Sequence, residues 1–263
     1  MALDRATIAA LARHLDDCVR EVRDTEKLTD RHPEMDWADA YAIQDAWRAL
    51  ATAQGARVVG FKAGLTSVAK IRQMGVDSPV FGFLLDRFAI PEGGEVAASS
   101  LIHPRIEPEI AFVLKRKLEG PGVHVGAVLA ATEFVIPAIE VIDSRYRDFK
   151  FDLKSVVADN TSAARFALGG QPRAVAGLDL RTLGVVLSVN GEGRAFGAGA
   201  AVLGHPAAAV AALANHLAAR EEALPEGSVV LSGGVTEALA VRAGDSVLLE
   251  VQSLGVVGFR LAA

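Results

Sequence analysis

The sequence predicts an α+β protein, in which a smaller, mainly helical N-terminal region precedes a β-rich core. Between Leu3 and Val22, apolar residues recur at spacings of three and four, as they do along one face of an amphipathic helix, and residues 36–53 repeat this pattern. Later in the chain, short runs rich in β-branched residues predominate. Helices segregated from a mostly β core are typical of the α+β class.

A polar link separates the two predicted helices. Residues 29–36 read T-D-R-H-P-E-M-D, and a proline within such a polar segment indicates a loop. Asp36 stands directly before the second apolar pattern. Its carboxylate is therefore predicted to cap that helix by accepting a backbone N–H.

The remaining elements are mostly strands. Residues 57–64 predict a short strand, a helical pattern runs from there to Gly75, and D-S-P-V-F-G then turns the chain. An alanine-rich helix is predicted over Pro206–Arg220. We divide the chain into an N-terminal α/β region, residues 1–78, and a larger domain, residues 79–263. The other predicted strands are Ile110–Leu114, Phe134–Ile142, Gly184–Val189, Val229–Leu231, Ser246–Val251 and Val256–Leu261.

Composition excludes several classes of function. The formal net charge is -5 and the chain has no block of lysine and arginine, which argues against a nucleic-acid-binding surface. Cys18 is the only cysteine, so an internal disulfide is excluded, and we expect a buried thiol in a reducing compartment. No apolar run reaches the roughly 20 residues of a membrane span, and the N-terminus lacks a signal-peptide pattern. We therefore expect a cytoplasmic protein without membrane contacts.

Two glutamates occupy alternate positions in H-P-R-I-E-P-E-I-A-F-V. If the backbone is extended, Glu107 and Glu109 project from one face with Cα atoms roughly 6 to 7 Å apart, which suits two ligands of one cation. Pro108 cannot donate to a strand ladder, so we expect an edge or the beginning of a strand. The alternative is a solvated edge that bears two like charges.

A third glutamate has almost entirely apolar neighbours. Glu140 lies within F-V-I-P-A-I-E-V-I, and burying an unpaired carboxylate costs several kcal/mol. It therefore requires a cation, hydrogen bonds or a raised pKa. A structural salt bridge to Arg145 or Arg105 is the alternative. Three glutamates without histidine or thiol partners at ligand spacing favour Mg²⁺ or Mn²⁺ over zinc.

Three further segments are candidates for binding. Lys62 lies between glycines in G-F-K-A-G, where it either binds a substrate carboxylate or extends its ammonium group to water. Residues 158–162 (A-D-N-T-S) can bind an anion or cap a helix through Asp159 or Asn160. Residues 232–236 (S-G-G-V-T) resemble a backbone anion nest or an ordinary turn. No dinucleotide fingerprint, phosphate loop, G-x-S-x-G elbow or H-E-x-x-H occurs.

Together these motifs resemble the hydratase/decarboxylase group of the fumarylacetoacetase superfamily. The resemblance spans nearly the whole chain and implies a β-rich catalytic core of mixed sheets, or β-roll, behind the N-terminal region. It also implies that Glu107, Glu109 and Glu140 hold the metal. The motifs that carry it are F-K-A-G-L-T-S, G-V-D-S-P-V-F-G, H-P-R-I-E-P-E-I-A-F, P-A-I-E-V-I-D-S-R, V-V-A-D-N-T-S-A and G-A-G-A-A-V-L-G-H-P.

The resemblance also assigns residues to the substrate. Lys62 matches the active-site lysine, Ser162 a hydroxyl near the substrate and Thr236 the threonine of the late glycine motif. Hydratases of the group tend to carry an acid where this chain has Val80. Adding water to a diene needs a proton-transferring group, whereas loss of CO₂ chiefly needs an electron sink and a dry pocket. Val80 therefore favours decarboxylation.

The expected activity is Mg²⁺-dependent decarboxylation of 2-oxohex-3-enedioate, in the meta-cleavage pathway of aromatic catabolism. The alternatives are hydration of 2-hydroxypenta-2,4-dienoate, hydrolysis of acylpyruvates, and a non-catalytic subunit that stabilises a partner hydratase. The resemblance also implies association with that hydratase, because its dienol substrate is unstable. We expect a homo-oligomer as well.

Overall fold

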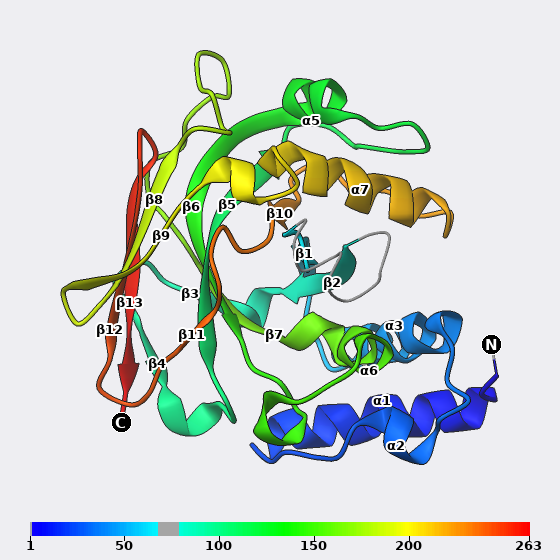
Figure 1. Cartoon of the computed structure of the whole chain (residues 1–263). Coiled ribbons are helices and arrows are strands. Elements are labelled where there is room, and N and C mark those ends of the chain that lie inside the picture. Colours follow the sequence, from blue (N-terminus) through cyan, green and yellow to red (C-terminus); the bar gives the residue numbers. More distant parts are fainter. Residues whose placement is uncertain (1, 68–78) are drawn as a thin grey trace.

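The computed structural model describes residues 2–67 and 79–263. Its longer helices lie in the N-terminal region and near residue 210, and short 3-10 turns connect other elements (Figure 1). The helices are α1 (Arg5–Arg20), α2 (Leu28–Arg31), α3 (Trp37–Ala53), α5 (Val125–Ala131), α6 (Leu153–Ala158) and α7 (Pro206–Ala218). The 3-10 turns are η1 (Asp86–Phe88), η2 (Ala98–Ser100), η3 (Arg147–Phe149), η4 (Asn160–Ser162) and η5 (Gly199–Ala201).

Two mixed sheets form the core. The first has the order β2 (Val80–Leu85), β1 (Val58–Gly64), β10 (Val229–Leu231), β5 (Arg105–Leu114), β6 (Thr132–Ile142), β7 (Ala163–Leu168) and β3 (Ala89–Ile90), with β11 (Leu239–Ala240) also paired to β5. The second has the order β4 (Glu95–Ala97), β13 (Gly255–Ala262), β12 (Ser246–Val251), β8 (Gly184–Val189) and β9 (Glu192–Ala198). Parallel pairs occur among antiparallel ones, so the predicted α+β class with a mixed β-rich core is confirmed.

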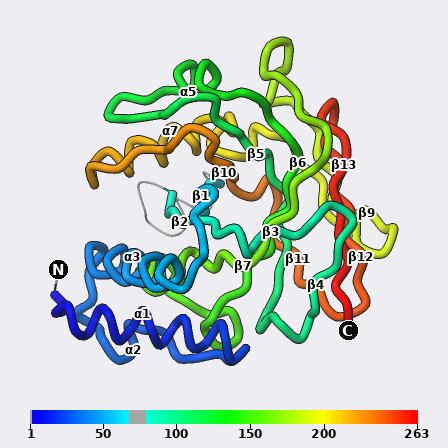
Figure 2. The backbone as a smooth tube through the Cα atoms, turned by 180° about the vertical axis from the view of Figure 1, so that it is seen from behind, coloured from blue at the N-terminus to red at the C-terminus, as the bar shows by residue number. Residues whose placement is uncertain are grey.

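The long, curved strands β5 and β6 lie side by side in the middle of the first sheet (Figure 1). β12 and β13 of the second sheet pack against β6, and α7 packs near β1 (Figure 1). Seen from behind, α1 and α3 lie side by side at one end of the first sheet, and α5 and α7 lie at the other (Figure 2).

α1 and α3 form where the sequence predicts helices, whereas the short helix α2 occupies the start of the segment predicted as a loop. Asp36 accepts the Asp39 N–H at 2.8 Å, and the Asp39 side chain accepts the Asp36 N–H at 3.0 Å, which completes a capping box at α3. Cys18 is fully buried on the apolar face of α1, as expected. Both predictions are therefore confirmed.

The strand at residues 58–64 belongs to the main sheet. β1 pairs with β10 in parallel and with β2 in antiparallel orientation, while α6 packs against α3 beside the N-terminal helices. The predicted boundary between residues 78 and 79, and the helical pattern before Gly75, fall at residues outside the described ranges. The division into residues 1–78 and 79–263 remains a prediction.

One helical segment has the length and composition of a membrane span. Residues 199–218, which include η5 and α7, have a mean hydropathy of 1.2, and half of this segment is buried inside the fold. The regular helix within it is α7, which has 13 residues and is shorter than the roughly 20 residues of a membrane span. α7 packs against α5 and β1 as a core helix does.

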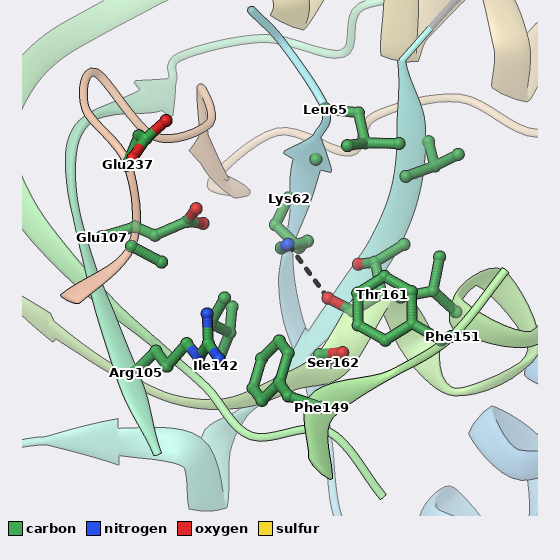
Figure 3. Close-up of a pocket in the computed structure, with 14 residues that line it drawn as sticks. Lys62, Leu65, Arg105, Glu107, Ile142, Phe149, Phe151, Thr161, Ser162 and Glu237 are labelled. Carbon is green, nitrogen blue, oxygen red and sulfur yellow. Dashed lines mark hydrogen bonds between the residues drawn. The ribbon is translucent and has the colours of Figure 1, made fainter. Parts of the chain in front are cut away.

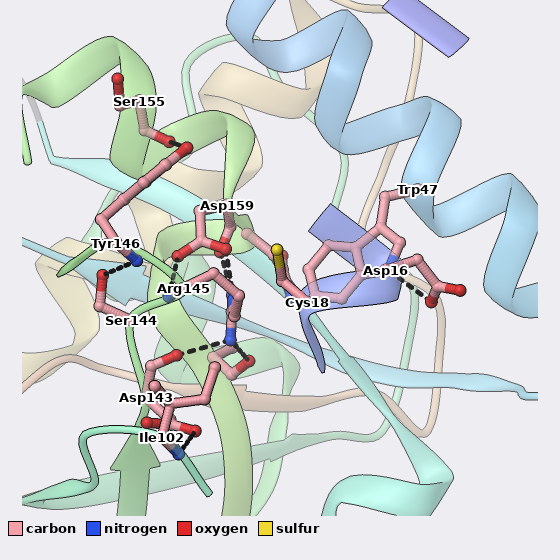
Figure 4. Close-up of polar contacts among 12 residues, drawn as sticks. Asp16, Cys18, Trp47, Ile102, Asp143, Ser144, Arg145, Tyr146, Ser155 and Asp159 are labelled. Atoms are coloured by element: carbon pink, nitrogen blue, oxygen red, sulfur yellow. Dashed lines mark hydrogen bonds and ion pairs between the residues drawn. The ribbon is translucent and has the colours of Figure 1, made fainter. Parts of the chain in front are cut away.

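A buried ion pair connects the N-terminal helices to the core (Figure 4). The Arg145 guanidinium pairs with the Asp159 carboxylate and donates to the carbonyl oxygens of Asp143 at 2.7 Å and Ala163 at 3.2 Å. It also lies over the Trp47 ring of α3, 5.2 Å from the ring centre. Burial raises the pKa of Asp159 to about 6, against the opposing charge of Arg145. At pH 8 both groups are therefore charged.

Asp159→Asn is expected to lower the free energy of unfolding by about 3–5 kcal/mol at pH 8, because it leaves the Arg145 charge buried without a counter-charge. Urea denaturation measures this change. The matched control is Glu119→Gln, which removes the carboxylate of an exposed pair with Lys117 and should cost less than about 1 kcal/mol. Equal effects of the two substitutions would contradict the account.

Candidate active site

Two of the three predicted glutamates face each other across β5 and β6. In the antiparallel register Glu107 of β5 is directly opposite Glu140 of β6, and Glu109 is two residues further along β5. Like charges directly opposite each other destabilise a sheet. The pairing of Glu107 with Glu140 therefore indicates that a cation compensates these charges.

The carboxylates converge. One oxygen of each of Glu107, Glu109 and Glu140 lies within 4.8 Å of the others, and this is the only such group of three potential ligands in the described part of the chain. Glu109 and Glu140 are fully buried, whereas Glu107 is half-buried. The geometry confirms that the three side chains come together.

Several of these buried oxygens lack a donor. Glu109 Oε2 accepts the Gly233 N–H at 2.6 Å, but within the described residues Glu109 Oε1 and Glu140 Oε1 have no partner, and Glu140 Oε2 has only the Lys62 ammonium, 3.1 Å away. Buried polar atoms are almost always partnered, and carboxylate oxygens are the ligands that hard divalent cations prefer. The residues present therefore fit a Mg²⁺ or Mn²⁺ ion.

Lys62 is buried rather than extended to water. Its Nζ lies 3.1 Å from Glu140 Oε2 and donates to the carbonyl oxygen of Thr161 at 3.3 Å. The alternative of a solvent-exposed ammonium is wrong, because the side chain is only 2% exposed. The alternative salt bridge of Glu140 to an arginine is also wrong, since Lys62 takes that place and Arg145 pairs elsewhere.

The protonation states in this cluster depend on one another. Burial alone lowers the pKa of Lys62, but the three glutamates outweigh it, so its pKa lies above the ordinary value. Burial raises the pKa of Glu140 to about 7, with Lys62 opposing the shift. Burial, followed by repulsion from Glu140, also raises the pKa of Glu109 well above its ordinary value. The metal-free cluster therefore holds protons near neutral pH.

Binding of Mg²⁺ is expected to become about tenfold tighter between pH 6 and pH 8. The metal binds the deprotonated carboxylates, and Glu140, with a pKa of about 7, is mostly neutral at pH 6 and mostly charged at pH 8. Calorimetric titration of the metal-free protein at both pH values measures the ratio. An affinity that is flat or falls as pH rises contradicts this prediction.

A left-handed turn faces Lys62. Asn160, Thr161 and Ser162 have φ values of 49°, 51° and 60°, a conformation that L-residues rarely adopt and that clusters at functional sites. The Asn160 side chain holds the turn against β2, accepting the Phe83 N–H at 2.9 Å and donating to the Phe83 carbonyl oxygen at 3.0 Å. Asp159 stands at the N-cap position of η4, but its side chain makes no capping hydrogen bond and pairs with Arg145 instead, so the helix-capping alternative is wrong.

The turn presents two hydroxyl groups to a cavity. Thr161 Oγ1 and Ser162 Oγ are buried without a hydrogen-bond partner, and both residues line the cavity next to Lys62 (Figure 3). Ser162, predicted as a hydroxyl near the substrate, thus lies at the cavity, and its contact with a substrate remains a prediction. Thr161 was missed, since nothing in A-D-N-T-S distinguishes it from its neighbours.

The cavity has a volume of about 400 Å³, within the range of small-molecule sites. Figure 3 shows Lys62 and Glu107 among the side chains around it. The residues that line it are Lys62, Gly64, Leu65, Val80, Arg105, Glu107, Ile142, Phe149, Phe151, Val156, Thr161, Ser162, Glu237 and Ala238. Of the predicted substrate contacts, Lys62, Val80 and Ser162 therefore lie at this cavity.

Thr236 lies beside the cavity rather than in its lining. Its hydroxyl donates to the Glu237 carbonyl oxygen at 3.1 Å, while the neighbouring Glu237 and Ala238 line the wall. In the same loop, the Gly233 N–H binds the carboxylate of Glu109. Contact of Thr236 with a substrate remains a prediction.

Pro108 lies in the middle of β5 rather than at an edge. It pairs with Ile139 of β6, and its carbonyl oxygen accepts the Val235 N–H at 2.9 Å. The nitrogen and carbonyl of a strand residue point to the same side, so the Pro108 nitrogen faces the loop between β10 and β11, where no ladder bond is lost. The expected edge position was wrong for this reason.

Comparison with known proteins shows which family model and which characterised proteins the chain is similar to. The model of the fumarylacetoacetate (FAA) hydrolase C-terminal family matches residues 57–262. The 4-oxalocrotonate decarboxylase of Pseudomonas sp. (strain CF600) is 55% identical over 258 residues, 98% of each chain. The 2-hydroxyhexa-2,4-dienoate hydratase of Comamonas testosteroni is 42% identical over 96% of each chain. Among solved structures, 4-oxalocrotonate decarboxylase from Pseudomonas putida G7, complexed with magnesium and adipate, matches with a TM-score of 0.96 and 51% identity over 98% of both chains.

Proposed function

The chain belongs to the fumarylacetoacetate hydrolase family, and we propose that it decarboxylates 2-oxohex-3-enedioate (4-oxalocrotonate) to 2-hydroxypenta-2,4-dienoate and CO₂ in the meta-cleavage pathway of aromatic catabolism. The observation that carries the proposal is the convergence of Glu107, Glu109 and Glu140 beside the buried ammonium of Lys62. The resemblance drawn from sequence motifs is confirmed by the family match.

Glu107, Glu109 and Glu140 would hold Mg²⁺ or Mn²⁺. When bound, the cation supplies Lewis-acid stabilisation for the C1 carboxylate and the 2-oxo group of the substrate. The chain must supply further positive charge, because three carboxylates and a dication sum to one negative charge and the substrate adds two more. Lys62 is positioned to provide it.

Lys62 would stabilise the oxygen that becomes negative during the reaction. The bond between C5 and the distal carboxylate breaks, and its electron pair moves through the conjugated chain to the 2-oxo oxygen while CO₂ departs. An ammonium fixed by Glu140 and the Thr161 carbonyl needs no reorientation as that charge develops. The unpartnered hydroxyl of Ser162 would orient a substrate oxygen, and Thr236 is a second candidate for that role.

Val80 distinguishes decarboxylation from hydration. Its side chain is 3% exposed and lines the cavity, so it excludes water but cannot transfer a proton. Ile142 and Phe151 are further apolar residues of the lining, and an apolar lining favours loss of charge as a carboxylate becomes CO₂. The hydratase remains the alternative, since hydratases also occur among the relatives.

We propose that the chain is cytoplasmic and forms both a homo-oligomer and a complex with a 2-hydroxypentadienoate hydratase. The chemical reason is the product: a dienol ketonises in water, and transfer to an adjacent hydratase shortens its exposure. A chain that only stabilised that hydratase would bind Mg²⁺ stoichiometrically without turnover of any 2-oxo acid.

A product assay tests the proposed activity. Purified protein with Mg²⁺ and 2-oxohex-3-enedioate is expected to release one CO₂ for each dienol formed, and metal-free protein should release little until Mg²⁺ or Mn²⁺ is added. Formation of 4-hydroxy-2-oxopentanoate from the dienol without CO₂ would identify a hydratase instead. Absence of any turnover would support the assembly role.

A further inference from the structure

One cation at the cavity has no assigned partner. Arg105 lines the cavity at the beginning of β5, and the structure records no hydrogen bond or ion pair for its guanidinium within residues 2–67 and 79–263. Among the described residues, this group contacts the ring of Phe149, whose centre is 4.3 Å from Cζ. By contrast, the ammonium of Lys62 is already engaged by Glu140. Of the described cations that line the cavity, Arg105 is therefore the one without a charged partner and can bind a ligand.

Arg105 shares a strand face with the metal-binding candidates. It precedes Glu107 by two residues, so both side chains project from the same side of β5, about 6 to 7 Å apart at Cα. Figure 3 shows Arg105 and Phe149 on one side of the cavity, with Leu65 on the other and Glu107 and Lys62 between. Arg105 is therefore offset from Glu107 by one two-residue repeat along β5.

We propose that Arg105 binds the distal carboxylate of the substrate and makes the site selective for 2-oxo dicarboxylic acids over 2-oxo monocarboxylic acids. The identity of the substrate rests on the proposed function. The guanidinium presents a planar set of donors that matches a carboxylate in bidentate geometry. The Phe149 ring restricts its plane, so less rotational freedom is lost when the carboxylate binds.

The charge of Arg105 stabilises the bound substrate more than the departing CO₂. A guanidinium paired with a carboxylate loses that interaction as the carboxylate becomes neutral. Its contribution is therefore to binding and to the orientation of the C5–C6 bond, rather than to stabilisation of the transition state. Loss of Arg105 is expected to raise KM for the dicarboxylate about 10- to 100-fold, with a much smaller change in kcat.

The test compares two ligands that differ in one carboxylate. Binding of 2-oxohexanedioate and 2-oxohexanoate to the Mg²⁺-loaded protein is measured by calorimetry for the natural chain, Arg105→Met and Arg105→Lys. The natural chain should prefer the dicarboxylate about 10- to 100-fold, Arg105→Met should bind both ligands with similar affinity, and Arg105→Lys should retain part of the preference. Affinity for 2-oxohexanoate should be nearly unchanged throughout.

Arg147→Met is the matched control. Arg147 is exposed on η3 and does not line the cavity, so its loss changes the net charge equally while the preference should persist. If Arg105→Met and Arg105→Lys both kept the full preference for the dicarboxylate over the monocarboxylate, the inference would be overturned. This outcome is distinct from failure of the proposed function, which appears as absent CO₂ release by the natural chain even when the ligand preference depends on Arg105.

Discussion

Glu140→Gln is expected to lower kcat about a thousandfold and to weaken Mg²⁺ binding by about a hundredfold or more, so that excess metal does not restore activity. The amide keeps the shape of the side chain but removes a charged oxygen from the group that meets within 4.8 Å. It also leaves Lys62 without its closest counter-charge. Steady-state decarboxylation and calorimetric titration with Mg²⁺ give the two values.

The control for this prediction lies on the same strand. Glu133 is exposed at the start of β6, so Glu133→Gln changes the net charge equally without touching the cluster. It should retain full activity and metal affinity. If Glu140→Gln reached the activity of the natural chain at high Mg²⁺ concentration, Glu140 would not belong to the essential ligand set.

Lys62→Met is expected to lower kcat about a hundred- to a thousandfold while Mg²⁺ binding stays as tight or becomes tighter. The apolar side chain has a similar length but cannot stabilise the oxygen that gains charge. It also removes a positive charge 3.1 Å from Glu140, and that charge opposes a nearby divalent cation. The same two measurements therefore separate Lys62 from the metal ligands.

Lys150→Met serves as the matched control, because Lys150 is largely exposed, 79% by side-chain area, and pairs only with Asp148. The kcat of the Lys150→Met variant should equal that of the natural chain. A loss of Mg²⁺ binding in Lys62→Met that accounts for its loss of activity would show that Lys62 maintains the cluster rather than acting on the substrate.

The elements with a clear internal pattern could be predicted from the sequence. The strands at Gly184–Val189, Val229–Leu231 and Ser246–Val251 occur with the predicted bounds, and the helix at residues 206–218 ends two residues early. The alternation that puts Glu107 and Glu109 on one face depends only on strand geometry. These features depend on residues that are close together in the sequence, so a single sequence is enough to predict them.

Features that depend on distant partners could not be predicted. The strand β2, at residues 80–85, was not predicted, because its first three residues belong to the turn signal D-S-P-V-F-G and its partner β1 lies earlier in the chain. The left-handed turn around Thr161 is held by the backbone of Phe83, a contact across 77 residues. No local signal in the sequence encodes either pairing.

The ion-pair partners of Glu140 and Arg145 also depend on residues that are distant in the sequence. Burial of Glu140 was predictable from its apolar neighbours, but the choice of Lys62 over Arg145 as its partner follows from the sheet order and from Asp159 binding Arg145. Arg105 lies within the motif H-P-R-I-E-P-E-I-A-F, where the sequence suggested only a salt bridge to Glu140, and its position at the cavity, over the Phe149 ring, indicates a different role.

The most direct test of the central claim is the location of the metal. Crystals grown with Mn²⁺, measured at the manganese absorption edge, are expected to show one anomalous peak about 2.1 to 2.2 Å from an oxygen of each of Glu107, Glu109 and Glu140. A peak elsewhere in the molecule, or a cluster that stays empty at saturating Mn²⁺, would contradict the account.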